Sequence, residues 1–181
     1  MLCYGLEMVD AVKLVKRWRS RIMVNGIYFK TIIGQFGLLE AEDKIVGVLL
    51  PGEKFPEGVE IRETPLLLEG ARQIEAYLDG ELKEFTLPVS YKGTDFMKKV
   101  WTALIDIPYG ETRCYKEIAE SVGSSTAARA VGLANNRNPL PIIVPCHRVI
   151  GKSGKMVGYR GGLSIKQQLL ELERIVSENE K

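Results

Sequence analysis

The segment PLPIIVPCHRVI, residues 139–150, decides how the rest of this 181-residue chain is interpreted. It places a thiol, Cys146, directly beside the only histidine of the chain, His147. The run Ile142–Val144 before it is short, apolar and β-branched, which is typical of a buried extended segment. Pro145 fixes its own φ and restricts the preceding residue to extended geometry. The cysteine is therefore predicted to stand on a stiff, buried support.

A cysteine is reactive when a partner raises its thiolate fraction and a reactant can reach it. His147 can be that partner, but neighbouring side chains of an extended chain point to opposite faces. The chain must therefore turn at Cys146–His147 if the two are to act together. A buried structural cysteine beside an unrelated histidine is the alternative for a bare Cys-His pair, so the context must decide.

The composition, 45% hydrophobic and 27% charged, indicates a soluble globular protein of one or two small domains. The three cysteines lack Cys-x-x-Cys spacing and one histidine cannot complete a zinc site, so we expect no metal, no cofactor and no disulfide framework. Free thiols favour a reducing, cytoplasmic location. Early charges and the lack of a long apolar run argue against a signal peptide and a membrane partner.

Charge is distributed unevenly along the chain. Residues 26–90 carry a net charge of −6 and residues 91–181 carry +5, with +7 inside the segment 92–166. A basic segment attached to an acidic one predicts an anionic partner, with nucleic acid as the leading candidate. An ordinary solvated basic face is the alternative.

The first half reads as a sheet with helices. Residues 7–22 have the spacing of an amphipathic helix, which could pack or serve as a basic docking surface. Three strand-like runs predict an antiparallel meander, and Thr64-Pro65 predicts the start of a helix that ends near Gly80. The runs are Ile27–Ile33, Phe36–Ala41 and Ile45–Leu50, and the residues predicted to face inward from the helix are Leu67, Leu68, Ala71, Ile74 and Leu78. We place a domain boundary in the linker that follows, dividing residues 1–90 from residues 91–181.

The second half is mostly helical. A helix after Thr94, a short helix over Tyr115–Val122 and a helix over about 126–135, separated by Gly-containing turns, predict a helix-turn-helix. The last of these helices carries mostly small side chains on its surface, and Arg129 is its one long side chain. Such a helix either lets a partner approach its backbone or packs tightly in a core. A capping box at Ser164–Gln167 predicts the start of the final helix, on which Lys166, Leu170 and Glu173 share a face.

Several segments in a fixed order make the chain resemble the O6-alkylguanine-DNA alkyltransferase family. They are RQIEAYLDG (72–80), PYGET (108–112), ARAVG (128–132), Asn138-Pro139 and PCHRV (145–149). The likeness runs from about Pro65 to Glu173 and leaves residues 1–25 out. It implies an α/β (α+β) fold, with an N-terminal antiparallel sheet and helix that support a C-terminal winged helix-turn-helix-like domain.

The resemblance also implies a reaction: stoichiometric transfer of an alkyl group from guanine O6 in duplex DNA to Cys146, after base flipping from the minor groove. By this resemblance His147 takes the thiol proton through a water, Glu173 orients and charges the imidazole, and Tyr115 hydrogen-bonds guanine N3. Arg129 fills the vacated stack, Asn138 links the recognition helix to the cysteine, and the small residues Ala128, Ala130 and Gly132 face the groove. The expected partner is double-stranded DNA containing O6-alkylguanine, bound by a monomer.

The same resemblance predicts the pocket for the flipped base. The carbonyls of Cys146 and Val149 would accept from the exocyclic amine, the amide of residue 160 would donate to O6, Tyr159 would form a wall, and Lys166 would lie near the tyrosine. Arg160 stands where some members have serine, and Asn135 occupies a position that is often apolar.

Three other functions remain open from the sequence. An alkyltransferase-like protein binds alkylated DNA without reacting, but such proteins lack the cysteine. A winged-helix transcription factor would need base-reading polar side chains on its recognition helix. A cysteine hydrolase would turn over, whereas an alkyltransferase stops after one event.

Overall fold

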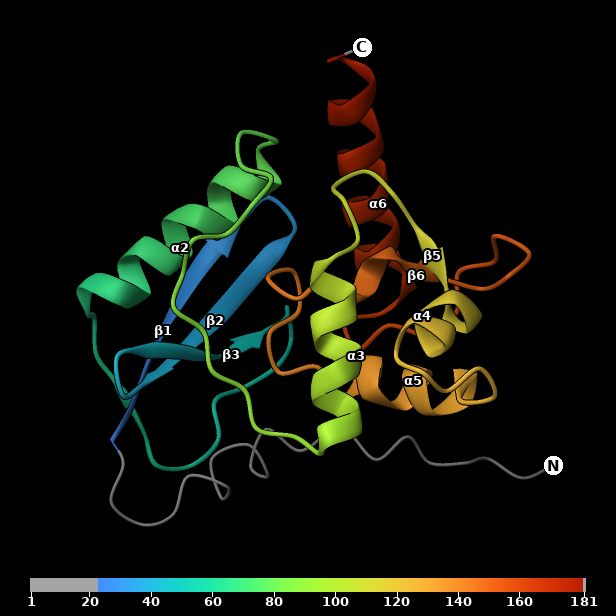
Figure 1. Cartoon of the computed structure of the whole chain (residues 1–181). Coiled ribbons are helices and arrows are strands. Elements are labelled where there is room, and N and C mark those ends of the chain that lie inside the picture. Colours follow the sequence, from blue (N-terminus) through green and yellow to red (C-terminus); the bar gives the residue numbers. More distant parts are fainter. Residues whose placement is uncertain (1–22, 181) are drawn as a thin grey trace, which may run out of the picture.

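The computed structural model describes residues 23–180, so the helix predicted over residues 7–22 lies outside the described residues. Figure 1 shows a sheet covered by one helix on one side of the molecule and the remaining helices on the other. The sheet has the strand order β3-β2-β1-β4. Its strands are β1 (Val24–Thr31), β2 (Gly34–Ala41), β3 (Lys44–Leu49) and β4 (Val59–Ile61).

The predicted antiparallel meander is confirmed for β1, β2 and β3. Glu42 and Asp43 form the turn between β2 and β3, both with positive φ, as tight hairpins require. The fourth strand was missed, and it pairs parallel to β1 through Val24, Asn25 and Gly26. Three residues are too few to give a periodic signal, so a strand of this length after a Pro/Gly-rich loop is not visible in the sequence.

Helix α2 (Pro65–Leu78) begins as predicted, because the Thr64 side chain accepts from the Leu67 amide at 3.1 Å. It ends at Leu78 with Asp79 as its C-cap, and Gly80 follows with a φ of 79°. Leu68 was wrongly predicted to face inward and is 49% exposed, because it lies to one side of the buried stripe. Tyr77 completes that stripe and is fully buried.

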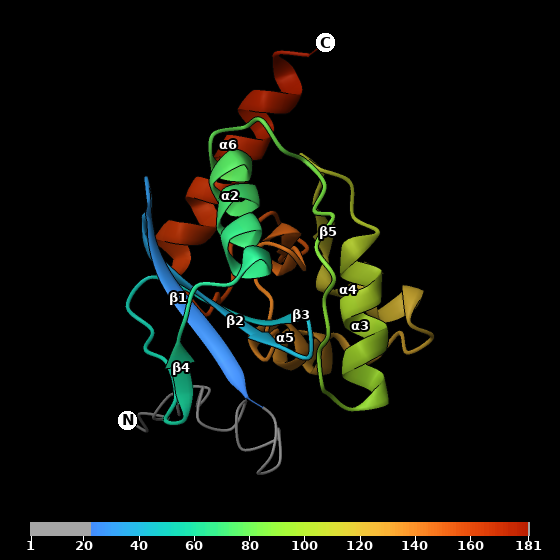
Figure 2. The same ribbon diagram turned by 90° about the vertical axis from the view of Figure 1, so that its left-hand side faces the viewer.

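The C-terminal half contains α3 (Asp95–Ile105), α4 (Tyr115–Ser121), α5 (Ala128–Asn136) and α6 (Leu163–Glu178). Two short strands, β5 (Arg113–Cys114) and β6 (Val149–Ile150), pair in parallel. The turn between α4 and α5 contains Gly123 with a φ of 77°, and the two helices form the predicted helix-turn-helix. Figure 2 shows the C-terminal end of α2 beside α6, where a Cβ on Gly80 would touch Val176.

The predicted capping box at Ser164 is wrong. Helix α6 starts at Leu163 with Gly162 as its N-cap, and the Ser164 hydroxyl accepts from the Gln168 side chain at 3.2 Å instead. Gly162 has a φ of 87°, a conformation open to glycine, so the chain enters the helix two residues earlier. The predicted face survives this shift, because Lys166 and Glu173 are both buried.

One hydrophobic core runs through both halves of the described chain, from Leu38 and Ile45 in the sheet to Trp101 and Leu104 in α3. Backbone hydrogen bonds also join the halves: Ile45 donates to the Pro88 carbonyl at 2.8 Å and Val48 to the Pro139 carbonyl at 2.9 Å. The second bond anchors the cysteine segment to β3. The division at residue 90 stays a prediction.

Candidate active site

The segment that leads to the cysteine is buried but not extended. Ile142 has a φ of 74°, and the Val144 amide donates to the Leu140 carbonyl at 2.7 Å, so the predicted extended run is a tight turn. Asn138 holds it, accepting from the Leu140 amide at 2.9 Å and donating to the Val144 carbonyl at 2.7 Å. A β-branched residue rarely adopts positive φ, so these bonds offset local strain.

The chain turns at Cys146–His147 as predicted, in a 3₁₀ helix, η1 (Cys146–Arg148). The Cys146 sulfur accepts a hydrogen bond from Asn138 Nδ2 at 3.2 Å, and the residue is only 6% exposed. Burial raises the pKa of the Cys146 thiol by more than Asn138, Arg160 and Lys166 lower it. In the resting protein Cys146 is therefore a protonated thiol, whose proton must be removed before the sulfur can act as a nucleophile.

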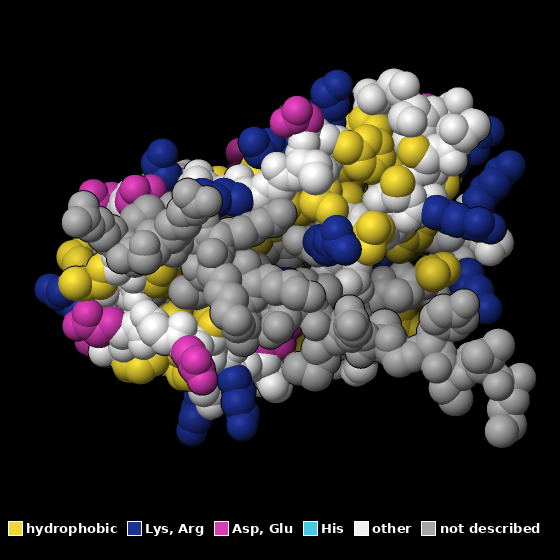
Figure 3. Space-filling view, turned by 90° about the horizontal axis from the view of Figure 1, so that it is seen from below, with side chains coloured by type: hydrophobic (Ala, Val, Ile, Leu, Met, Phe, Trp, Pro, Cys, Tyr) yellow, Lys and Arg dark blue, Asp and Glu magenta, His cyan; other side chains and the backbone are white. Residues whose placement is uncertain are grey.

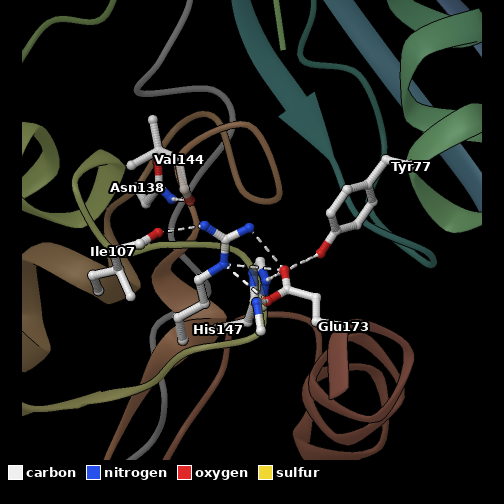
Figure 4. Close-up of polar contacts among 8 residues, drawn as sticks. Tyr77, Ile107, Asn138, Val144, His147 and Glu173 are labelled. Atoms are coloured by element: carbon white, nitrogen blue, oxygen red, sulfur yellow. Dashed lines mark hydrogen bonds and ion pairs between the residues drawn. The ribbon is translucent and has the colours of Figure 1, made fainter. Parts of the chain in front are cut away.

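The carboxylate of Glu173 lies against His147, as predicted, with 2.9 Å between Nε2 and Oε1 (Figure 4). Two further side chains, which sequence reasoning missed, bind the same carboxylate. Arg148 Nε lies 3.0 and 2.9 Å from the two carboxylate oxygens, and the Tyr77 hydroxyl donates to Oε1 at 2.6 Å. The Gly110 amide donates to Oε2 at 3.0 Å. We call Tyr77, His147, Arg148 and Glu173 the relay cluster.

Arg148 and Tyr77 differ in whether the sequence could have identified them as partners of Glu173. Arg148 is a cation inside an apolar segment, and such a residue needs a buried acid, so its position could have pointed to a partner. It also donates to the Ile107 carbonyl at 2.6 Å. Tyr77 is an ordinary core residue by helical spacing, and nothing local distinguishes its hydroxyl.

Burial acts differently on the two members of the His147–Glu173 pair. Burial raises the pKa of Glu173, but hydrogen bonds and charges from His147 and Arg148 outweigh it and bring the pKa to about 2. For His147, burial outweighs the attraction of Glu173 and lowers the pKa. The resting pair is therefore carboxylate and neutral imidazole: Glu173 favours the charged imidazole, as the resemblance implies, but burial outweighs it in the resting protein.

The protonation pattern of His147 follows from its partner. An ionised carboxylate only accepts hydrogen bonds, so the neutral imidazole carries its proton on Nε2. Its Nδ1 is then a free lone pair, and this buried atom has no hydrogen-bond partner among the described residues. The site thus combines a buried thiol with an unprotonated ring nitrogen on the next residue.

A cavity of about 430 Å³ opens over Cys146 beside α5. It brings together most of the predicted binding residues: Tyr115, Ala128, Arg129, Gly132, Tyr159 and Arg160. Ala130 is exposed on the same helix and does not line the cavity. Asn135 does, and both polar atoms of its side chain are buried without a partner among the described residues.

Lys166 and Val149 lie behind the cavity wall. Lys166 is fully buried and donates to the carbonyls of Val149 at 2.5 Å and Val157 at 3.3 Å. The Tyr115 hydroxyl donates to the same Val157 carbonyl at 3.2 Å. Lys166 therefore ties the loop at Val157 to the cysteine segment, and the Val149 carbonyl has one lone pair left for a ligand.

Arg160 does more than border the cavity. Its guanidinium donates to the carbonyls of Asn138 at 2.7 Å and Val48 at 2.8 Å, and its Nε lies 2.9 Å from a Glu53 carboxylate oxygen. This side chain connects the pocket loop to β3 and to the turn that holds the cysteine. The long residue at this position is thus pinned rather than free to block the pocket.

Comparisons with known proteins identify the family of the chain. A family model described as the 6-O-methylguanine DNA methyltransferase DNA-binding domain matches residues 95–175. A constitutive methylated-DNA–protein-cysteine methyltransferase of Bacillus subtilis is 49% identical over 153 residues, 81% of this chain and 93% of the relative. A relative of the same name from Methanosarcina barkeri is 64% identical over 105 residues, which cover 58% of this chain and 66% of that protein.

The structures agree as well. The OGT of Mycobacterium tuberculosis, solved in complex with DNA, superposes with a TM-score of 0.80 at 43% identity, covering 84% of this chain and 94% of that one. Within residues 23–180, no helix is long and apolar enough to cross a membrane, and no group of three or more His, Cys, Asp or Glu could hold a metal ion. The chain belongs to the family of methylated-DNA–protein-cysteine methyltransferases.

Proposed function

We propose that this protein repairs double-stranded DNA by transferring the alkyl group of O6-alkylguanine to Cys146, once per molecule. The observation that carries the proposal is a buried thiol at a cavity of about 430 Å³, beside a neutral imidazole whose second nitrogen is held by an ionised carboxylate. That arrangement can remove the thiol proton through a water that joins the thiol to His147 Nδ1. The names of the relatives support the same reaction.

The transfer balances with the groups present. The Cys146 sulfur forms a bond to the alkyl carbon while the carbon–O6 bond breaks, and its electron pair leaves with guanine. The thiol proton passes through a water to Nδ1 of His147, and Glu173 stabilises the imidazolium that results. Tyr115, whose hydroxyl lies in the cavity wall, can donate to the departing base. The thioether product is stable, so the protein does not turn over.

A guanine stacked in a duplex cannot reach a sulfur that is buried to this extent, so the base must be flipped out. The small residues of α5 permit a close approach of DNA, and the exposed Arg129 at the cavity can replace the base in the stack. Figure 3 shows Lys and Arg side chains around an apolar area on the side of α4 and α5. One chain supplies every group used here, so we also propose a monomer, and its free thiols suit the cytoplasm.

The test is the intact mass of the protein after incubation with a duplex containing O6-methylguanine. We expect the mass of one methyl group per protein, located on Cys146, and no gain with the undamaged duplex. Cys146→Ala should show no gain and should keep its affinity for DNA. Methyl on Cys114, release of product beyond one equivalent, or binding without transfer would each contradict the proposal, and the last two would favour a hydrolase and an alkyltransferase-like protein.

A further inference from the structure

The relay cluster includes a residue from the half of the chain that the sequence assigned only a supporting function. Tyr77 comes from α2, and its side chain is completely buried. Its ring packs against Phe85 at 5.5 Å, Tyr109 at 5.9 Å and the His147 ring at 6.4 Å between centroids. Packing on three sides holds the hydroxyl in one place.

The hydroxyl of Tyr77 meets the one carboxylate oxygen that His147 also uses. Glu173 Oε1 lies 2.6 Å from the Tyr77 oxygen and 2.9 Å from His147 Nε2, and these two atoms are 3.2 Å apart. Figure 4 shows the tyrosine and the imidazole converging on the carboxylate from different elements. Because burial and the Glu173 charge raise the pKa of Tyr77 well above its ordinary value, the phenol stays protonated and serves as a donor.

We propose that Tyr77 is a positioning residue of the alkyl transfer, whose hydroxyl shares Glu173 Oε1 with His147 and keeps the imidazole a neutral proton acceptor. A carboxylate oxygen that accepts from several donors offers less to each of them, so the phenol weakens the pull of Glu173 on a charged imidazole. The proposal rests on the proposed function, because it assigns Tyr77 a part in the same proton transfer.

The charges around His147 fix the direction of the effect. From α6 it faces Glu173 and Lys166, from η1 Arg148, and from α2 Tyr77, with the Cys146 thiol next to it in the chain. Tyr109 packs on Tyr77 and lies 5.5 Å below the Arg148 guanidinium. The two cations oppose a charge on the imidazole and only Glu173 favours it. Removing the Tyr77 hydroxyl makes Glu173 a stronger hydrogen-bond acceptor for His147. The charged imidazolium is then more stable relative to the neutral imidazole.

The chain offers a matched control for this hydroxyl. Tyr109 lies in the same aromatic cluster, and its hydroxyl is also buried, but it has no hydrogen-bond partner among the described residues. Tyr77→Phe and Tyr109→Phe therefore remove the same atom from the same cluster, and only the first removal changes Glu173. A purely structural contribution of aromatic packing would affect both variants alike.

The first measurement needs no substrate. His147 is the only histidine of the 181 residues, so ¹⁵N-histidine labelling gives the two ring-nitrogen signals of one imidazole in the NMR spectrum. We expect Nε2–H tautomer in the parent, and titration of the ring at a pH about one unit higher in Tyr77→Phe. Tyr109→Phe should titrate with the parent. An Nδ1–H tautomer in the unaltered protein would overturn the proposal even if Tyr77→Phe failed to fold.

The second measurement is the rate of transfer from an O6-methylguanine duplex between pH 4 and 9. The acid limb should shift upward in Tyr77→Phe, giving roughly tenfold slower transfer on that limb and a change within about twofold above it. Thermal melting of each variant shows whether it is folded. Coincident profiles for Tyr77→Phe and the parent, or equal shifts in both variants, would overturn the proposal. Failure of the parent to transfer at all would instead refute the proposed function, and the NMR titration would still test Tyr77.

Discussion

Two regions meet at the Cys146 sulfur, and they differ in how their polar groups are satisfied. Behind it, the Glu173 carboxylate accepts from Tyr77, His147, Arg148 and a backbone amide. In front, the cavity contains the Asn135 amide, whose side-chain atoms are buried without partners among the described residues. Folded proteins normally pair such groups. The polar groups of the relay cluster are therefore paired in the free protein, whereas the Asn135 amide beside the cavity is not.

The largest effect on stability is expected from removing the negative charge of Glu173. Glu173→Gln leaves the buried Arg148 without its counter-charge, and we expect the free energy of unfolding to fall by about 3–5 kcal/mol. Transfer should also slow, because nothing then stabilises the imidazolium. Urea unfolding measures the first effect. The control is Glu171→Gln on the exposed face of α6, where the partner Arg174 is also exposed and the free energy of unfolding should stay close to that of the parent. Parental stability in Glu173→Gln would show that the cluster does not hold the fold.

The same carboxylate predicts how stability depends on pH. The pKa of Glu173 is about 2 in the folded protein, against an ordinary value of 4.5. A depressed folded pKa gives stability that is present above pH 4.5 and is lost as the pH falls towards 2, in total about 3 kcal/mol. The lowered pKa of His147 adds a loss of the same sign at pH values below its ordinary pKa. As the pH is lowered from 7 to 2, the free energy of unfolding should therefore decrease more steeply in the parent than in Glu173→Gln.

The sequence predicted the parts of this molecule that depend on local rules. Thr64-Pro65 identified the start of α2, and the turn at Cys146–His147 followed from the need of the two side chains to act together. The capping box failed because two residues could each begin α6 and the left-handed conformation of Gly162 decided between them. The run at Ile142 was misread because its turn is imposed by the Asn138 side chain, which periodicity does not record.

The site residues that were predicted are those that the motifs and the family resemblance contain. They identified Cys146, His147 and Glu173, and the structure brings the last two into contact. Tyr77 and Arg148 were missed because their bonds to Glu173 close over 96 and 25 positions, and spacing carries no information about such pairs. The resting charge states of Cys146 and His147 could not be predicted, because burial decides them and a sequence does not give the burial of a particular atom.

Asn135, in the last turn of α5, and Asn138, just after that helix, should have opposite effects on stability when replaced by leucine. Asn138→Leu leaves the Leu140 amide and the Val144 carbonyl unpaired, which should cost about 2–3 kcal/mol of unfolding free energy. Asn135→Leu removes an amide without partners and should raise the unfolding free energy by about 1 kcal/mol. Thermal or urea unfolding of both variants checks the pair. A loss of stability in Asn135→Leu would mean that its amide is already satisfied in the free protein.

The smallest change in stability is expected at the cavity mouth, with Arg129→Ala. Arg129 is exposed on α5 and lines the cavity, so its loss should alter the free energy of unfolding by less than about 0.5 kcal/mol. Its effect should appear only when a base must leave the stack, a step that costs a few kcal/mol in a duplex and nothing for a free base. Transfer from an O6-methylguanine duplex should therefore slow at least tenfold, whereas reaction with free O6-benzylguanine should stay within about twofold.

Arg137→Ala, at the exposed end of the same helix and outside the cavity, controls for the loss of a positive charge near DNA. If Arg129→Ala slows both substrates equally, the residue shapes the pocket and does not replace the flipped base. If Arg137→Ala slows duplex repair as much as Arg129→Ala does, charge alone accounts for the effect.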